Sequence, residues 1–117
     1  MFSEIVRFNG LLGAVPKQID LLKLQAAAGE ACRLLKVLSN TDRLLLLCQM
    51  TQGAFSVSEL EAVTGIRQPT LSQQLTVLRE EQLVHTHRSG KQIFYSITSN
   101  EALAVLQLLD KLYCPKE

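Results

Sequence analysis

Residues 68–76 carry a row of side chains that can both donate and accept hydrogen bonds. The row consists of Gln68, Thr70, Ser72, Gln73, Gln74 and Thr76. A helix face that is exposed to water usually carries charged residues such as Glu and Lys instead. Leu71, Leu75 and Leu78 recur among them at steps of four and three, which predicts an amphipathic helix. The polar face of that helix has the hydrogen-bonding groups needed to recognise a second polar surface.

Three cysteines are the other side chains with reactive chemistry. Cys32, Cys48 and Cys114 lie far apart and form no CxxC pair, so the sequence predicts neither a disulfide framework nor a zinc knuckle. The N-terminus lacks the basic and apolar regions of a signal peptide, and no uncharged run is long and apolar enough to cross a membrane. We therefore expect a cytoplasmic location, where thiols are kept reduced.

Length and charge place limits on the fold and on the partner. A chain of 117 residues with 47% hydrophobic content predicts one domain with a single core. The net charge of +1 is unevenly distributed, because residues 1–66 are balanced and residues 67–92 carry a charge of +2. The basic residues of that second segment are Arg67, Arg79, Arg88 and Lys91. This excess is weak support for a polyanionic partner.

Two helices are expected before the polar segment. Residues 1–16 contain two glycines and a proline and are interpreted as a flexible arm, which leaves 17–117 as the single domain. Apolar residues at steps of three and four predict a helix over 17–38. Ser39 or Asn40 should cap a second helix from Thr41 to about Met50. Because this second helix is apolar almost all round, we expect it to be buried.

The polar helix is expected to be the second half of a helix-turn-helix. Ser56 and Glu59 have the spacing of a capping box for a short helix that ends before Gly65. Pro69 suits the first turn of the next helix, and Gln68 precedes or caps it. This next helix should run to about Gln82. Two short helices joined by so tight a turn are typical of a helix-turn-helix.

A β-hairpin and a last helix complete the predicted fold. Residues 84–88 and 93–97 alternate in polarity, and Ser89-Gly90-Lys91 supplies a turn between them. Thr98 and Glu101 then have capping-box spacing. An apolar stripe that ends at Tyr113 predicts the last helix. The order indicates a mainly α chain with a small β-hairpin, an α+β fold of the winged helix-turn-helix type.

This order explains the polar row. Glutamine, serine and threonine side chains can pair with base edges in the major groove of DNA, and lysine and arginine bind phosphates. The candidates for base contacts are Gln68, Thr70, Ser72, Gln73 and Gln74. The candidates for phosphate or minor-groove contacts are Arg67, Arg79 and the hairpin tip, Arg88, Ser89 and Lys91. A solvated surface helix is the alternative, and the turn before it and the basic hairpin after it favour double-stranded DNA.

The run from residue 35 to residue 98 resembles the ArsR/SmtB family of dimeric bacterial repressors. The resemblance rests on LLKVLSNTDRLLLL, on FSVSELEAVTGIRQPTLSQQLTVLREEQLV and on HRSGKQIFYSI. It implies a homodimer that pairs through its first and last helices. Such a dimer would bind an inverted-repeat operator and leave it when an inducer arrives.

Metal sensing, which is common in that family, is not expected here. Many relatives carry an LCVCDL-type sequence, and this chain has Ser56 and Ser58 where the cysteines would stand. The last helix contains no histidine. His85 and His87 share one face of the hairpin, and two ligands are too few for a metal site. We therefore predict no metal and no cofactor.

The thiols are similar to those of the sulfide- and persulfide-responsive branch of the family, the BigR/SqrR type. Cys48 in LLLLCQM and Cys114 in KLYC match that branch, and Cys32 is interpreted as a small apolar residue. The resemblance implies release from DNA when the pair reacts with persulfide, polysulfide or an oxidant, and control of sulfide detoxification genes. A sensor of general oxidants and a metal-responsive repressor are the alternatives.

The sequence also bears on which of Cys48 and Cys114 reacts first. Desolvation among leucines should suppress ionisation of Cys48. Lys111 and Lys116 should favour the thiolate of Cys114, while the negative end of its helix opposes it, and Cys114 is the preferred first nucleophile. A thiol enzyme is disfavoured, because no CxxC motif or neighbouring base is evident. A winged helix that binds only proteins is the remaining rival class.

Overall fold

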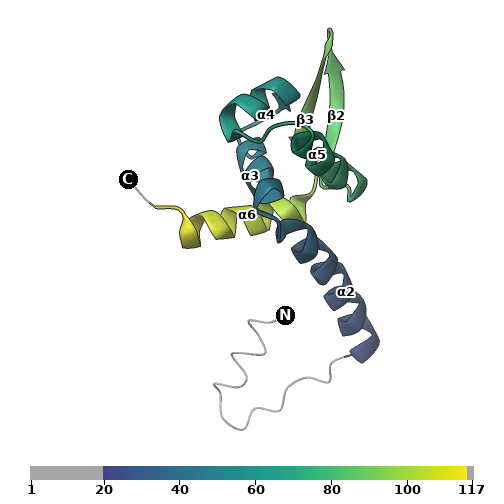
Figure 1. The fold of residues 1–117 in the computed structure, drawn as a ribbon. Coiled ribbons are helices and arrows are strands. Elements are labelled where there is room, and N and C mark those ends of the chain that lie inside the picture. Colours follow the sequence, from purple (N-terminus) through teal and green to yellow (C-terminus); the bar gives the residue numbers. More distant parts are fainter. Residues whose placement is uncertain (1–19, 116–117) are drawn as a thin grey trace. The chain divides into compact units, whose positions relative to one another are not determined.

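Five helices and three short strands follow one another in residues 20–115, the part of the chain that the computed structural model describes. The elements are α2 (Leu21–Leu38), α3 (Thr41–Met50), β1 (Phe55–Ser56), α4 (Val57–Thr64), α5 (Thr70–Glu80), β2 (Val84–Ser89), β3 (Gln92–Ile97) and α6 (Asn100–Tyr113) (Figure 1). The chain from Cys32 onward forms one compact unit, to which the end of α2 belongs. The expected arm over 1–16 lies outside the described residues.

Local capping signals determine where the helices begin and end. The side chain of Asn40 accepts a hydrogen bond from the backbone N–H of Arg43 at 3.0 Å, which starts α3. The predicted capping box of α4 is present, because Ser56 and Glu59 each bond the other's backbone N–H. Gly65 then ends α4 in the left-handed conformation at φ 74°.

The cap expected for the last helix is wrong by one residue. Ser99, rather than Thr98, caps α6 by accepting the backbone N–H of Ala102 at 3.0 Å. Thr98 is still tied to the sheet region, since its own N–H donates to the carbonyl of Leu83 at 2.9 Å. The capping position therefore falls on the next hydroxyl along the chain.

The hairpin is the predicted wing, and a third strand joins it. β2 and β3 pair antiparallel from Val84↔Ile97 to Ser89↔Gln92, so the turn is Gly90-Lys91 and Ser89 belongs to the strand. Gly90 has a φ of 62°, which glycine adopts without strain. The two-residue strand β1 pairs with β3, giving the order β1-β3-β2. Sequence reasoning missed β1, because two residues show no alternation.

The core is built mainly from leucines of α3, α4 and α5. Its largest fully buried side chains are Leu46, Leu47, Leu60, Leu71, Leu75 and Leu78. Ala102 and Leu106 of α6 close it from one side. The expectation that α3 is buried all round is wrong, because Leu45 and Cys48 are exposed on the side away from Leu46 and Leu47.

The second half of α6 leaves the core. The predicted stripe is buried at Ala102 and Leu106, but Tyr113 is 79% exposed. Leu108 and Leu112 are also exposed, and they lie four residues apart on one face of the helix. The described part of this chain therefore presents an uncovered apolar face on α6. None of its helices is long and apolar enough to cross a membrane.

Candidate DNA interface and dithiol site

The polar row lies on the outer face of α5. Leu71, Leu75 and Leu78 fix the inner face of this helix in the core, and Ser72 and Gln73 are exposed on its first turns. Figure 1 shows α5 beside the β2–β3 hairpin, which projects away from the helices. The arrangement has the predicted form: a helix with free hydrogen-bonding groups, followed by a projecting wing.

The start of α5 is organised by Gln68 rather than by a conventional cap. Pro69 occupies the N-cap position, where it offers no side-chain acceptor. The side-chain oxygen of Gln68 instead accepts from the backbone N–H of Ser72 at 3.1 Å and from its hydroxyl at 2.7 Å. Two hydrogen bonds thus join the exposed residues Gln68 and Ser72, and the amide NH₂ of Gln68 remains available to a ligand.

Gln74 differs from the rest of the row. It is half-buried, and its side-chain oxygen accepts from Arg43 Nη1 at 2.9 Å. The same guanidinium donates from Nε to the carbonyl of Val37 at 2.7 Å and from Nη2 to that of Lys36 at 3.4 Å. Arg43 therefore connects the last turn of α2 to α5. The side-chain oxygen of Gln74, which was expected to contact a base, already accepts a hydrogen bond from this arginine.

Sequence reasoning missed Arg43 as a functional residue. A signal was present, because Arg43 is the single basic residue in the leucine-rich TDRLLLLCQM helix. A guanidinium carries donors in a fixed fork, so one side chain can satisfy several acceptors. Its partner Gln74 is 31 residues away, and the sequence alone gives no reason to pair them.

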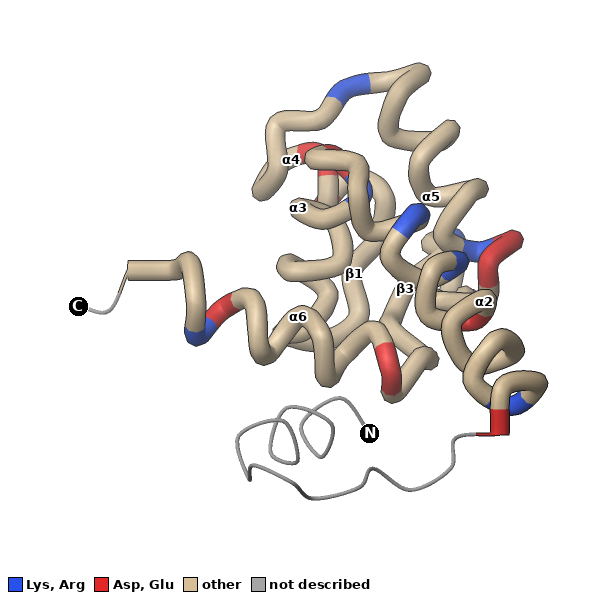
Figure 2. The backbone as a smooth tube through the Cα atoms, turned by 90° about the horizontal axis from the view of Figure 1, so that it is seen from below, with Lys and Arg blue, Asp and Glu red and all other residues tan. Residues whose placement is uncertain are grey.

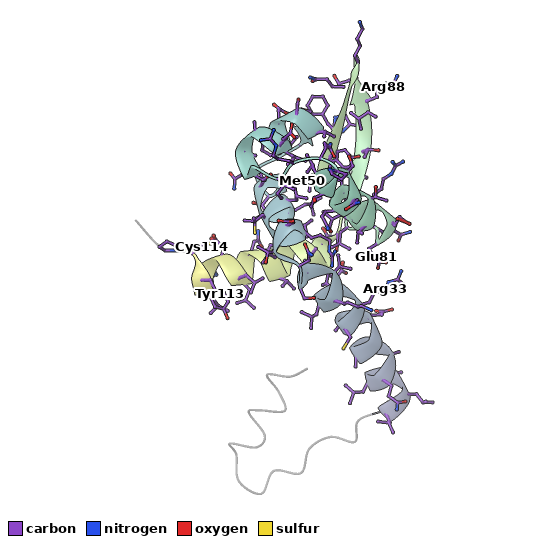
Figure 3. The ribbon with its side chains drawn as sticks, in the orientation of Figure 1. Arg33, Met50, Glu81, Arg88, Tyr113 and Cys114 are labelled. Carbon is purple, nitrogen blue, oxygen red and sulfur yellow. The ribbon has the colours of Figure 1, made fainter. Side chains whose placement is uncertain are left out.

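A second link joins the same two helices at the surface. Arg33 Nε donates to Glu81 Oε1 at 2.8 Å (Figure 3). Arg33 is 73% exposed in its side chain and Glu81 is 29% exposed. The carboxylate raises the pKa of Arg33, chiefly through this hydrogen bond.

The wing presents its basic residues at the tip. Arg88, Ser89 and Lys91 are all exposed there, and Figure 3 shows Arg88 on the projecting part of the hairpin. Arg67 and Arg79 are exposed at either end of α5. These positions form a discontinuous polar and basic surface on one unit of the chain.

The two wing histidines have partners across the hairpin. The ring of His87 stacks on that of Phe94 with centroids 5.6 Å apart, and His85 Nε2 lies 3.3 Å from the hydroxyl of Ser96. Within residues 20–115, no three His, Cys, Asp or Glu side chains are placed to hold a metal ion. The geometry gives the histidines structural contacts in the sheet.

Cys48 and Cys114 lie on the same open hollow, although 66 positions separate them in the sequence. Residues of α3 and α6 line this hollow of about 920 Å³, and Asp110 and Lys111 lie beside the two thiols. Cys48 comes from α3, and Cys114 follows the last residue of α6 (Figure 3). Both thiols are free and exposed, whereas Cys32 lies on α2 outside the hollow.

Neither thiol is activated in this arrangement. Desolvation raises the pKa of Cys48, as expected from its apolar neighbours, and the charge of Asp110 adds to the effect. A hydrogen bond with Asp110 is the main reason that the pKa of Cys114 is also raised. The pKa of Cys114 is therefore raised and not lowered as the neighbouring lysines led us to expect, because Asp110 acts against them; Lys116 lies outside the described residues.

Comparison with known proteins decides the family. Residues 40–86 match the bacterial regulatory proteins of the arsR family. The chain is 47% identical over 100 residues to the biofilm growth-associated repressor of Agrobacterium fabrum (strain C58), which covers 86% of each chain. The chain belongs to the ArsR family.

Solved structures of other ArsR proteins agree with the fold. The transcriptional repressor BigR from Xylella fastidiosa superimposes with a TM-score of 0.76 at 45% identity, covering 84% of this chain and 100% of that one. A homodimeric winged helix-turn-helix DNA-binding domain from Mycobacterium bovis gives 0.66 at 26% identity, covering 84% and 89%. This ArsR protein is thus a BigR-like transcriptional repressor and not an enzyme, and the predicted BigR-type branch is confirmed.

Proposed function

We propose that the chain is a homodimeric repressor that leaves its operator when Cys48 and Cys114 become linked through sulfur. The observation that carries this proposal is the common hollow of the two thiols. One thiol belongs to the core helix α3, and the other follows α6 at the end of the described fold. The regulated genes would be those of sulfide detoxification, as the resemblance to the BigR/SqrR-type branch implies.

The chemistry requires a donor or an oxidant from outside the protein. One thiolate attacks the outer sulfur of a persulfide RS–SH, which forms Cys–S–SH and releases RSH after protonation. The second thiolate then attacks the cysteine sulfur and expels hydrogen sulfide, which leaves a disulfide. With peroxide, the first thiol becomes a sulfenic acid and releases water, and the second thiol displaces another water. Attack by further persulfide before closure would leave extra sulfur atoms in the bridge.

DNA would be read by α5 and the wing of each protomer. Gln68, Ser72 and Gln73, with Thr70, supply base contacts on the exposed face of α5. Arg67, Arg79, Arg88, Ser89 and Lys91 supply phosphate contacts. We assign Gln74 to the contact with Arg43 rather than to a base, because it is half-buried and bonded to that guanidinium, whereas Gln68, Ser72 and Gln73 are exposed.

A sulfur link can reach the DNA interface through α3. This helix carries Cys48, and through Arg43 it also holds α5. α6 carries Cys114 and the exposed apolar face that we assign to the dimer contact. Joining α3 to the end of α6 therefore changes the spacing of two recognition helices, which must fit half-sites about one DNA turn apart.

The test compares cysteine variants on a duplex that the reduced protein itself selects from a random pool. Cys48→Ser and Cys114→Ser should bind this duplex normally in fluorescence anisotropy, and polysulfide should no longer release them. Cys32→Ser is the matched control and should respond like the parent protein. Normal release of Cys48→Ser by polysulfide would show that the paired-thiol mechanism is wrong.

The nature of the bridge separates the proposed sensor from a sensor of general oxidants. Intact mass spectrometry after polysulfide treatment should show gains of about 32 mass units for each retained sulfur atom. Peroxide should give a loss of two hydrogens if it can close the bridge. Release by peroxide at concentrations as low as those of polysulfide would favour the general sensor.

A further inference from the structure

Asp110 lies where it can act on both thiols of the hollow. It precedes Cys114 by four residues, and the backbone N–H of Cys114 donates to the carbonyl of Asp110 at 3.0 Å, so the last helical turn is intact. Residues four apart on a helix share a face, which puts the carboxylate beside the Cys114 thiol. Cys48 lines the same hollow from α3. One carboxylate thus lines the same hollow as a thiol on α3 and a thiol that directly follows α6.

We propose that Asp110 keeps Cys48 and Cys114 protonated and slow to react, and so sets the threshold at which the dithiol site responds. The role of Asp110 in regulation rests on the function proposed above. A carboxylate disfavours a second negative charge nearby, and it accepts a hydrogen bond from a thiol but not from a thiolate. The thiolate is the nucleophile, so a group that disfavours it slows attack on any sulfur donor or oxidant.

The other charged groups around the hollow do not cancel this effect. Lys111 also lines the hollow and would favour a thiolate, yet the pKa of each thiol is raised, with Asp110 and not Lys111 among the causes. Figure 2 shows an acidic and a basic residue side by side near the end of α6. The negative end of the α6 dipole acts in the same direction as Asp110.

The remaining titratable groups of the hollow are few. Tyr113 is the other titratable side chain that α6 contributes, and the α3 side contributes Cys48 but no acid or base of its own among the described lining residues. The pKa values of both thiols are raised, with Asp110 among the causes for each. The direction agrees with the geometric argument.

The experiment measures thiol ionisation without requiring any sensor function. Single-thiol proteins are prepared, one keeping Cys114 and one keeping Cys48, each with and without Asp110→Asn. The rate of alkylation by iodoacetamide, an uncharged reagent, is followed by intact mass spectrometry from about pH 6 to about pH 10. Asp110 is exposed, so its replacement removes no core contact. Glu101→Gln is the matched control, since it removes an exposed carboxylate from the first turn of the same helix.

Asp110→Asn should move both rate profiles to lower pH and speed alkylation at pH 7 about threefold. The gain is modest because a thiolate becomes less nucleophilic as its pKa falls. Glu101→Gln should leave both profiles in place. Profiles that do not move with Asp110→Asn, or that move equally with Glu101→Gln, overturn the proposal. Asp110→Ser provides the same test if the asparagine variant does not fold.

A second measurement separates this inference from the proposed function. In the protein with both thiols, Asp110→Asn should also speed release from the selected duplex at a fixed polysulfide concentration. If the alkylation profiles move but polysulfide never releases the parent protein, Asp110 controls the thiols as inferred and the proposed function is wrong. Unchanged profiles overturn the inference even where polysulfide releases the parent protein normally.

Discussion

At the scale of single residues, the polar row on α5 divides into two kinds of glutamine. Gln73 is exposed, and among residues 20–115 its side chain has no hydrogen-bond partner. Gln74, the next residue, is half-buried and bonded to Arg43. The two neighbours differ because a helix turns by about 100° for each residue, so that Gln73 is exposed while Gln74 contacts Arg43.

Replacing Gln73 should therefore affect specific binding more than nonspecific binding. Gln73→Ala should cost about 1–3 kcal/mol on the selected duplex and almost nothing on random duplex, because an amide pair to a base edge carries sequence information. Fluorescence anisotropy with both duplexes measures the two losses. Gln107→Ala, at an exposed glutamine of α6, is the control and should change neither affinity. Equal losses on the two duplexes would exclude Gln73 from base reading.

At the scale of elements, two arginines connect the end of α2 to α5 with different expected strengths. Two hydrogen bonds of Arg43, to Val37 and Gln74, are partly buried and its third, to Lys36, is exposed, whereas the Arg33–Glu81 pair lies at the surface. Removing a donor from buried acceptors leaves them unsatisfied, at a cost of about 1–3 kcal/mol. An exposed ion pair contributes about 0–1 kcal/mol.

Arg43→Met should therefore lower the free energy of unfolding by about 2 kcal/mol, and Arg33→Met should leave it almost unchanged, because the side chain of Arg33 is exposed to solvent. Urea unfolding followed by circular dichroism measures both. Arg43→Met should also weaken operator binding, although Arg43 is not expected to touch DNA, because α5 loses the contact that orients it. Similar destabilisation by the two variants would contradict the distinction between buried and exposed links.

The end of α5 contains a local strain that can be removed. Gln82 has a φ of 63°, and the N–H of Leu83 donates to the carbonyl of Leu78 at 2.9 Å, as in a Schellman motif. Residues with a Cβ are disfavoured there. Gln82→Gly should raise the free energy of unfolding by about 0.5–1 kcal/mol, and Gly65→Ala, at the equivalent end of α4, should lower it by about 1 kcal/mol. Urea titration tests both, and opposite signs are the required result.

Features encoded by neighbouring residues could be predicted from the sequence. Asn40, the Ser56–Glu59 box and Gly65 are local signals, and each marks its helix end as expected. Contacts between distant residues could not be predicted. The Arg43–Gln74 bond and the pairing of β1 with β3 join segments that no periodicity connects. Composition likewise gave no indication of which side of α3 Cys48 would occupy.

At the scale of the whole molecule, α6 has two faces that differ in their surroundings. One face lines the dithiol hollow and includes Asp110. Leu108 and Leu112 do not line that hollow, and both are exposed. An apolar pair on the outside of a helix is a suitable contact for a second copy of the chain. The separation would let the thiols react while the dimer persists, so that release from DNA need not involve dissociation of the two protomers.

A single charge on the apolar face of α6 should test this assignment. Leu108→Glu should shift the protein from dimer to monomer in sedimentation velocity, because a carboxylate buried in an apolar contact is strongly disfavoured. Loss of the dimer should then weaken operator binding at least about tenfold, since each protomer would bind its half-site alone. Val63→Glu is the matched control, because Val63 on α4 is as exposed as Leu108, at 54% each. Val63→Glu should remain dimeric, and a dimeric Leu108→Glu protein with normal operator affinity would remove this face of α6 from the dimer contact.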